Sequence, residues 1–316
     1  MAFLSARRCA ARPGPLACAG MGTRFRRLAV LTVVAAALTA CSGGDDSGGR
    51  SAATSRSSAS SSAAAGGGSY LALGDSVPFG YRGGEQAAEY GTASNFTGYP
   101  ELVGKKLGLT VLNAACPGET SASFLDATAQ SNGCENSPTA PAGFRTAYPL
   151  HVQYTSPSQS QLDYAVSTLK KTKDVQLVTL MVGANDAFIC QATTADKCVS
   201  EVGTVAQTVG GNVGKVLTAV RQDAGYTGKV LVVTYYALDY SDTSTALGIQ
   251  VLNSAISQAA QAAQATVVSG FDAFQPTAQG SGGNSTTAGL VRPNDVHPTD
   301  RGQQLLAEAV EKALGR

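Results

Sequence analysis

The chain contains no tryptophan and only two histidines among its 316 residues, and aromatic residues make up 6% of the sequence. The candidates for a side chain that exchanges a proton near neutral pH are therefore limited to His151 and His297. The few aromatic rings give no sign of the stacking surface typical of sugar-binding clefts. The sequence also lacks a calcium-binding loop motif, a dinucleotide-binding glycine fingerprint and a P-loop, and we expect no cofactor.

Most of the chain carries no net positive charge. Six of the 23 basic residues and no acidic residue precede Cys41, so the remainder carries 17 basic against 22 acidic residues, a net charge of −5. Surfaces that bind nucleic acid are basic, so we expect no nucleic-acid partner. A modest negative charge is ordinary for a soluble domain outside the cytoplasm.

The apolar run near the N-terminus is too short to span a bilayer. It extends from Leu28 to Ala40, whereas a membrane-spanning helix takes about 20 residues. Arginines precede the run and it ends in the letters LTAC, which is typical of an export signal. Met21 is an alternative start to Met1, because the signal is already complete from there.

The LTAC ending resembles the lipobox of bacterial lipoproteins, in which the cysteine is lipidated and becomes the new N-terminus. We therefore expect residues 1–41 to be a signal peptide ending at Cys41, and the protein to be anchored outside the cytoplasm, on the outer face of a membrane. An ordinary cleaved signal, with secretion of the protein, is the alternative.

The next segment, residues 42–68, is almost entirely serine, alanine and glycine. Such a composition cannot bury a core, so it predicts a disordered tether of roughly 30 Å. Residues 69–316 have the length of one domain, which we expect to be monomeric.

Four cysteines remain in the predicted domain: Cys116, Cys134, Cys190 and Cys198. An even number in an exported protein indicates disulfides, and four cysteines allow three pairings. We expect the nearest-neighbour pairs, Cys116–Cys134 and Cys190–Cys198. A zinc site is the rival interpretation, but the spacing is unsuitable and no histidine lies nearby, so we expect no metal.

Apolar runs and helical patterns alternate along the domain. The runs are continuous, as in strands that are covered on both faces, and they cover residues 70–73, 109–112, 175–181, 230–235 and 266–268. Helical patterns cover residues 100–107, 159–171, 199–224, 245–265 and 299–314. This alternation predicts a three-layer α/β/α fold with a parallel central sheet, and ligands bind such sheets at the carboxyl ends of the strands.

Ser76 follows the first of these strands, in a run that reads LALGDSVPFG from Leu71 to Gly80. A serine hydroxyl becomes a nucleophile when a base removes its proton. His297 is the candidate base, because it closes the run NDVHP and because the proline after it favours an extended loop. His151 lies in a loop without such a motif, and we expect no catalytic role for it.

Attack by a serine on an ester creates an oxyanion, which needs hydrogen-bond donors in fixed positions. Three candidates follow strand ends: the backbone N–H groups of Ser76 and Gly118, and the side-chain amide of Asn185. Taken singly, Gly118 could be a turn glycine and Asn185 a capping residue. Their order along the chain, together with Ser76 and His297, favours a catalytic set.

These four blocks resemble the SGNH, or GDSL-type, hydrolase family, which is named after its Ser, Gly, Asn and His. The matching segments are GDSVPFG from residue 74, NAACPGET from residue 113, GAND from residue 183 and the His297–Pro298 dipeptide. The resemblance covers residues 70–314. It implies a flavodoxin-like fold, hydrolysis of esters without a metal, and an acyl-serine intermediate.

The chain departs from the family pattern beside the histidine. The family usually has Asp three residues before it, where this chain has Asn294, and Asp295 comes one residue later. Some members orient the histidine with a main-chain carbonyl at that position. We therefore expect a Ser76–His297 dyad oriented by the carbonyl of Asn294, with Asp295 as the alternative if the loop is bulged.

The sequence thus predicts an exported serine ester hydrolase, a carboxylesterase or lipase, that acts on acyl esters. A carbohydrate O-deacetylase or an O-acyltransferase with the same dyad is an alternative. A surface lipoprotein that binds a ligand without turnover is an alternative of another class.

Overall fold

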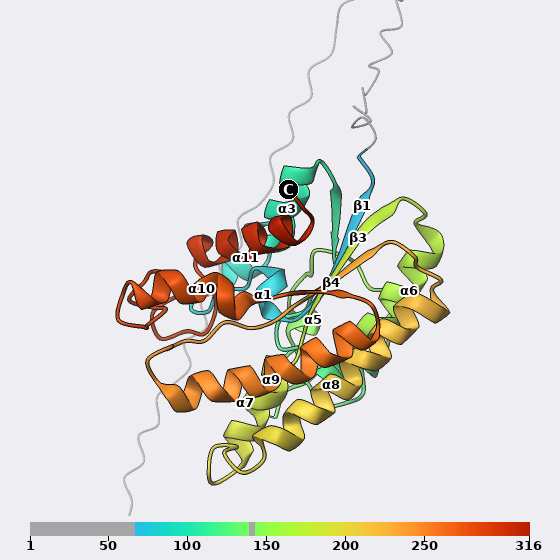
Figure 1. Cartoon of the computed structure of the whole chain (residues 1–316). Helices are drawn as coiled ribbons and strands as arrows, with labels where there is room; N and C mark the ends of the chain where they lie inside the picture. Colours follow the sequence, from blue (N-terminus) through green and yellow to red (C-terminus); the bar gives the residue numbers. More distant parts are fainter. Residues whose placement is uncertain (1–66, 139–142) are drawn as a thin grey trace, which may run out of the picture. The chain divides into compact units, whose positions relative to one another are not determined.

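The computed structural model describes residues 67–138 and 143–316, which form a five-stranded parallel sheet between two layers of helices (Figure 1). The predicted signal peptide, its Cys41 and nearly all of the predicted tether lie outside the described residues. Among the described residues, no helix has the length and apolar character needed to cross a membrane.

The strands stand in the order β2-β1-β3-β4-β5, and each neighbouring pair is parallel. They are β1 (Ser69–Gly74), β2 (Thr110–Asn113), β3 (Val175–Met181), β4 (Lys229–Val233) and β5 (Thr266–Val268). This order confirms the predicted flavodoxin-like fold. After β2 the chain crosses to the other side of β1, where β3, β4 and β5 follow in order. The strand order therefore reverses between β1 and β3. In such sheets the ligand site lies at this reversal, beyond the carboxyl ends of the two strands.

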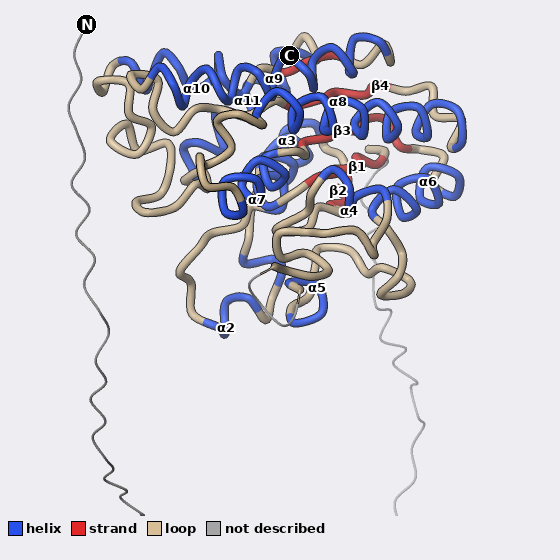
Figure 2. The backbone as a smooth tube through the Cα atoms, turned by 90° about the horizontal axis from the view of Figure 1, so that it is seen from below, coloured by secondary structure: helices blue, strands red, loops and turns tan. Residues whose placement is uncertain are grey.

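Helices cover both faces of the sheet (Figure 1). One layer holds α1 (Ser76–Phe79), α3 (Tyr99–Leu107), α10 (Gly270–Gln279) and α11 (Asp300–Ala313). The other holds α4 (Ser121–Leu125), α6 (Gln161–Lys171), α8 (Val202–Thr218) and α9 (Thr243–Ala262), and a π-helical turn, η2 (Ala219–Asp223), follows α8. The helix α7 (Ala184–Thr193) follows β3, and α2 (Ala87–Tyr90), η1 (Ala93–Asn95) and α5 (Phe144–Ala147) are short turns in the loops (Figure 2).

Burial and capping explain where these elements begin. Every residue of β1 is buried, which is why its apolar run does not alternate with polar residues. Thr299 caps α11 by accepting a hydrogen bond of 3.2 Å from the N–H of Gly302, and Asp242 caps α9 through Ser244 and Thr245. The predicted strands and long helices are confirmed, with ends displaced by up to six residues.

The apolar core has two parts. The main cluster joins the sheet to both helix layers. A smaller cluster is built around Phe79, Phe96 and Ala115, and it packs loop residues next to the first helix rather than against the sheet. This second cluster lies beside the candidate active site.

Candidate active site

The nucleophile candidate Ser76 is the first residue of α1, immediately beyond the end of β1. Asp75 caps this helix, and its Oδ1 accepts a hydrogen bond of 3.0 Å from the N–H of Val77. Gly74 has a φ of +138°, and a Cβ there would lie 2.0 Å from the carbonyl oxygen of Met181 on the neighbouring strand. The glycine therefore allows the sharp turn from strand to helix that exposes the serine.

His297 lies against Ser76 although 221 residues separate them in the sequence. Its Nε2 is 2.9 Å from Oγ of Ser76, and its Nδ1 is 2.5 Å from Oδ1 of Asp295. Serine, imidazole and carboxylate thus form one hydrogen-bonded chain, which has the geometry of a catalytic triad.

The expectation that the Asn294 carbonyl orients the histidine is wrong, because Nδ1 is bonded to the Asp295 carboxylate instead. The reason lies in the turn from Arg292 to Asp295. The N–H of Asp295 bonds to the carbonyl of Arg292 at 3.3 Å, Pro293 fills the second position and Asn294 has a φ of +56°. Proline followed by a residue with positive φ is the pattern of a type II turn, so Asn294 shapes the backbone that delivers Asp295.

The carboxylate of Asp295 is held in its ionised form. Burial alone would raise its pKa, but the hydrogen bond and charge of His297 and the N–H groups of Gly83 and Val296 lower the pKa of Asp295 to about 2. The N–H of Gly83 lies 3.0 Å from Oδ2, so both carboxylate oxygens have partners. An ionised carboxylate in this position stabilises an imidazolium on His297.

Gly118 lies in a second turn of the same kind. The N–H of Glu119 bonds to the carbonyl of Cys116 at 3.1 Å, Pro117 takes the second position and Gly118 has a φ of +86°. A Cβ at Gly118 would lie 2.6 Å from the carbonyl oxygen of Asn132. Glycine is therefore required here by both the backbone angle and the neighbouring loop.

Asn185 is buried in the first turn of α7, and both ends of its amide are fixed. Its Nδ2 donates to the carbonyl of Glu119 at 3.0 Å, and its Oδ1 accepts a bond of 2.9 Å from Nδ2 of Asn132. One Nδ2 hydrogen is left over from these contacts. In the described parts of the chain, the N–H groups of Ser76 and Gly118 also donate to no protein acceptor. Three donors suitable for an oxyanion are thus free.

Contacts between the loops fix these donors relative to the nucleophile. The side chain of Gln161 bonds to both the N–H and the carbonyl of Gly74, at 2.6 and 3.0 Å, and to the carboxylate of Glu119 at 2.8 Å. The N–H of Cys116 also bonds to the carbonyl of Gly74, at 3.0 Å. The turn that carries Gly118 is therefore attached directly to the turn that carries Ser76.

Both predicted disulfides are formed, Cys116–Cys134 and Cys190–Cys198. The first encloses Gly118 and brings Asn132 against Asn185. The second joins the end of α7 to the turn before α8, farther along the chain from Asn185.

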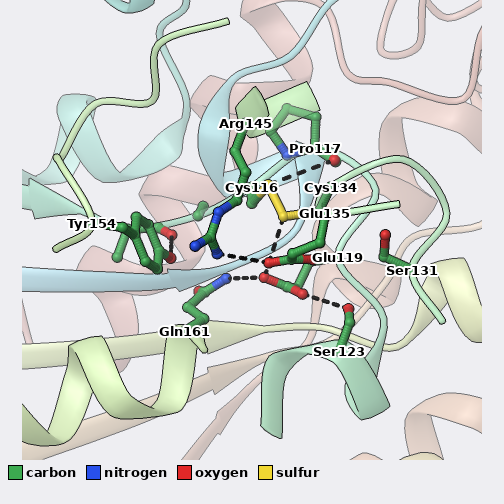
Figure 3. The surroundings of a disulfide bond; sticks show 12 residues. Cys116, Pro117, Glu119, Ser123, Ser131, Cys134, Glu135, Arg145, Tyr154 and Gln161 are labelled. Carbon is green, nitrogen blue, oxygen red and sulfur yellow. Dashed lines mark hydrogen bonds and ion pairs between the residues drawn. A yellow bond between two sulfur atoms is a disulfide. The ribbon is translucent and has the colours of Figure 1, made fainter. Parts of the chain in front are cut away.

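Two acidic side chains, Glu119 and Glu135, lie beside the first disulfide (Figure 3). Glu119 is fully buried, and its carboxylate accepts hydrogen bonds from Ser123 and Gln161 at 2.5 and 2.8 Å. Burial and the charge of nearby Glu135 raise the pKa of Glu119 well above its ordinary value of 4.5. Because Glu135 is paired with Arg145 at 2.8 Å, we assign the proton of this acidic pair to Glu119.

The same group is the one cluster of metal-ligating residue types in the described part of the chain: Cys116, Glu119 and Cys134 lie within 4.8 Å of one another. Both sulfur atoms are bonded in the disulfide, so neither is a thiolate. A single carboxylate then remains, and this ligand set does not fit a zinc site.

Aromatic rings gather beside His297, which the sequence did not indicate. Tyr81 packs edge-on against the His297 ring at a centroid distance of 4.8 Å, and it stacks with Tyr90 and Phe96. Phe144 packs edge-on against Tyr81, and its ring also contacts Tyr148. We call the five residues Tyr81, Tyr90, Phe96, Phe144 and Tyr148 the aromatic wall. The low aromatic content of the sequence therefore does not exclude a stacking surface.

The second histidine is placed elsewhere. Nε2 of His151 lies 3.0 Å from the carbonyl oxygen of Phe79, and its ring packs on the Phe79 ring at 4.7 Å.

Asn132 is the residue that sequence reasoning missed. Its position between two predicted disulfide cysteines was the available signal, since the bridge forces that segment against Gly118.

Known proteins resemble the chain in sequence and in fold. The profile of the GDSL-like lipase/acylhydrolase family matches residues 72–305. No curated protein matches the chain. The structure of phospholipase A1 from Streptomyces albidoflavus NA297 superposes with a TM-score of 0.52 at 19% identity, over 78% of this chain and 99% of that chain. This likeness supports the fold alone.

Two further solved structures resemble the chain more loosely. An acetylxylan esterase from Geobacillus stearothermophilus has a TM-score of 0.47 at 16% identity, over 79% of this chain and 95% of that chain. An α/β hydrolase enzyme from the metagenome of Lake Arreo has a TM-score of 0.46 at 15% identity, over the same shares of the two chains.

Proposed function

The chain belongs to the GDSL-like lipase/acylhydrolase family, and we propose that it hydrolyses carboxylic esters through an acyl intermediate on Ser76. The hydrogen-bonded chain from Ser76 through His297 to Asp295 is the observation that carries this proposal. A serine oxygen 2.9 Å from an imidazole nitrogen can pass its proton to that nitrogen while it attacks a carbonyl carbon.

In the first half of the reaction, Oγ of Ser76 bonds to the ester carbon and Nε2 of His297 takes the hydroxyl proton. The carbonyl oxygen becomes an oxyanion and accepts hydrogen bonds from the N–H groups of Ser76 and Gly118 and from the Asn185 amide. The imidazolium, stabilised by Asp295, gives its proton to the leaving alcohol. The ester C–O bond breaks and the acyl group stays on Ser76.

In the second half, a water molecule takes the place of the alcohol. His297 removes a proton from this water, which attacks the acyl carbon, and the same three donors hold the second oxyanion. Collapse of this intermediate releases the carboxylic acid and returns the proton to Ser76. Every proton passes through one imidazole nitrogen, so the reaction needs no other acid or base.

The aromatic wall favours an apolar acyl group as the part of the substrate next to His297. The hydroxyl groups of Tyr81 and Tyr90 lie 3.4 Å apart, and Tyr90 also donates to the carbonyl of Arg82 at 3.0 Å. These polar ends are therefore engaged inside the wall, so the partly exposed rings of Tyr81 and Tyr90 present apolar surface, whereas Phe96 is buried behind them. The second candidate, a carbohydrate O-deacetylase, is favoured by the same rings, because a stacked aromatic surface can also hold a sugar ring.

Hydrolysis rates of p-nitrophenyl acetate, butyrate, octanoate and palmitate, measured beside an acetylated xylo-oligosaccharide, distinguish these candidates. We expect turnover of the p-nitrophenyl esters that is abolished in Ser76→Ala, with the preferred chain length separating an esterase from a lipase. Turnover of the acetylated sugar alone would favour the deacetylase. A folded protein that hydrolyses no ester and is not labelled by a serine-reactive phosphonate would contradict the proposal, and would favour a ligand-binding protein.

We also propose that the protein acts outside the cytoplasm, anchored through a lipid on Cys41. The two disulfides support this location, because such bonds persist in oxidising compartments. Metabolic labelling with a fatty-acid analogue tests the anchor in a bacterial host. The full-length chain should be labelled and found in the membrane fraction, whereas Cys41→Ala should be unlabelled. Equal labelling of both would contradict lipidation at Cys41.

A further inference from the structure

Two consecutive tyrosines, Tyr235 and Tyr236, lie just beyond the end of β4 and are both buried. The sheet continues up to them, because the N–H of Thr234 bonds to the carbonyl of Val268 at 2.9 Å. Neither tyrosine belongs to a block that resembles the family, and neither touches the hydrogen-bonded chain of Ser76 and His297 directly. Their hydroxyl groups instead hydrogen-bond to the residue before Ser76 and to the residue before His297.

The hydroxyl of Tyr235 reaches the nucleophile. It donates a hydrogen bond of 2.5 Å to Oδ2 of Asp75, whose other oxygen caps the helix that begins with Ser76. This buried hydroxyl thus attaches the turn of the nucleophile to the end of β4.

The hydroxyl of Tyr236 reaches the histidine loop. It donates a hydrogen bond of 2.6 Å to the carbonyl of Val296, the residue between Asp295 and His297. The Tyr236 ring is itself fixed, because it stacks on Phe274 of α10 at a centroid distance of 4.3 Å. Within the histidine loop, the N–H of Asp295 bonds to the carbonyl of Arg292. The bond from Tyr236 to Val296 attaches this loop to the end of β4 in the central sheet.

The backbone of Tyr235 is also fixed, by a side chain of α9. Oδ1 of Asn253, on α9, accepts from the N–H of Tyr235 at 2.9 Å, and its Nδ2 donates to the carbonyl of Tyr235 at 2.7 Å. This side chain takes the place of a neighbouring strand, so neither of the two peptide units that flank the Tyr235 Cα can rotate without breaking a buried hydrogen bond.

We propose that Tyr235 and Tyr236 are positioning residues that set the distance between Ser76 and His297, Tyr235 through Asp75 and Tyr236 through the carbonyl of Val296. Adjacent side chains of an extended backbone point in opposite directions, so one dipeptide can reach both loops. This inference rests on the proposed ester hydrolysis. It adds that the spacing of the reacting groups is set by the end of β4 rather than by the loops that carry those groups.

The test compares Tyr235→Phe and Tyr236→Phe with Tyr70→Phe as the matched control. Tyr70 is a fully buried tyrosine whose hydroxyl lies 2.7 Å from Oγ1 of Thr179 within the sheet core. All three changes remove one buried, hydrogen-bonded oxygen atom. We expect kcat on p-nitrophenyl acetate to fall about tenfold in the first two variants, because small displacements of reacting groups are costly. We expect KM to change by less than about twofold, since ester binding is untouched. Tyr70→Phe should keep kcat even where its Tm falls by a similar amount.

A second measurement does not depend on turnover. With two histidines in the chain, selective ¹⁵N labelling gives two sets of ring signals, and His151→Gln assigns them. The His297 signals should change in Tyr235→Phe and Tyr236→Phe and stay as in the parent protein in Tyr70→Phe. Unchanged His297 signals, or a kcat no lower than that of Tyr70→Phe, would overturn the inference. A parent protein that hydrolyses no ester would contradict the proposed function, while the ring signals would still decide whether the tyrosines position His297.

Discussion

The side-chain amide of Asn132 donates a hydrogen bond of 2.9 Å to Oδ1 of Asn185, from a loop 53 residues earlier in the sequence. This contact determines which way the Asn185 amide faces. Its oxygen is turned to Asn132, so its nitrogen is turned to the Glu119 carbonyl and keeps a hydrogen for the oxyanion. Asn132 therefore controls an oxyanion donor without contacting the oxyanion.

Replacing Asn132 by Asp should lower kcat more than replacing it by Ala. A carboxylate at this position accepts hydrogen bonds only, so it repels Oδ1 of Asn185 and favours the reversed amide. Loss of one oxyanion donor typically costs about 10²-fold or more in kcat, and we expect Asn132→Asp to approach that loss. Steady-state kinetics of both variants, with Asn185→Ala as the reference, measure this. Equal activity of the Asp and Ala variants would show that the amide is held by Glu119 alone.

The two residues before Val296 should differ sharply in their importance. Asp295→Asn removes the charge that stabilises the imidazolium, and we expect kcat to fall by about 10²- to 10⁴-fold. Asn294→Gly keeps the main-chain carbonyl and suits the φ of +56°, so kcat should stay within about threefold of the parent value. If instead Asp295→Asn were well tolerated, the carboxylate seen at Nδ1 would have no catalytic importance.

The two disulfides should contribute similarly to stability and differently to activity. Their sequence separations of 18 and 8 residues correspond to about 3 and about 2.5 kcal/mol in the chain-entropy description. The pair Cys116→Ser, Cys134→Ser should lower both Tm and kcat, because that loop holds Gly118 and Asn132. The pair Cys190→Ser, Cys198→Ser should lower mainly Tm.

Thermal unfolding and ester hydrolysis of the two double variants check this expectation, with dithiothreitol treatment of the parent protein for comparison. The expectation would be wrong if the protein kept full activity after complete reduction of both bonds.

Glu119 should make the protein less stable as the pH rises. Burial raises its pKa well above 4.5 in the folded protein, so the folded state keeps a proton that the unfolded chain loses near pH 4.5. The contribution of this group to stability is fully present below that pH, and it falls as the pH increases toward the raised pKa of the folded state. Glu119→Gln holds no such proton and should escape this loss.

Urea unfolding at several pH values compares the two proteins. Their free energies of unfolding should converge near pH 4 and separate in favour of Glu119→Gln at higher pH. Hydrolysis should be retained, because the Asn185 contact uses only the backbone carbonyl of this residue and a glutamine keeps an oxygen that can accept from Gln161. A constant difference across the pH range would contradict the assignment of the proton to Glu119.

The sheet and the nucleophile could be predicted because their signals are local. A buried parallel strand reads as a largely apolar run, as β1 and β3 do, and a turn of small and polar residues marks where the run ends. The order of the blocks then brings Ser76, Gly118 and Asn185 to the same edge of the sheet, because parallel strands end together.

The orientation of His297 could not be predicted from spacing alone. Counting back three residues leads to Asn294, whereas the turn chemistry of Pro293 and Asn294 leads to Asp295. Proline followed by asparagine was the local signal for that turn. The aromatic wall could not be predicted, because its rings come from two loop segments, residues 81–96 and 144–148, which meet only through the tertiary fold.

The last described helix, α11, binds the first one directly. Gln303 donates to the carbonyl of Val77 at 3.0 Å and accepts from the N–H of Tyr99 at 2.9 Å, across 226 and 204 residues of sequence. Contacts of such long range form slowly and late in folding. Activity should therefore return after secondary structure when the denatured protein is refolded. A partly folded chain would hold every catalytic residue and still be inert, so catalysis itself reports that folding is complete.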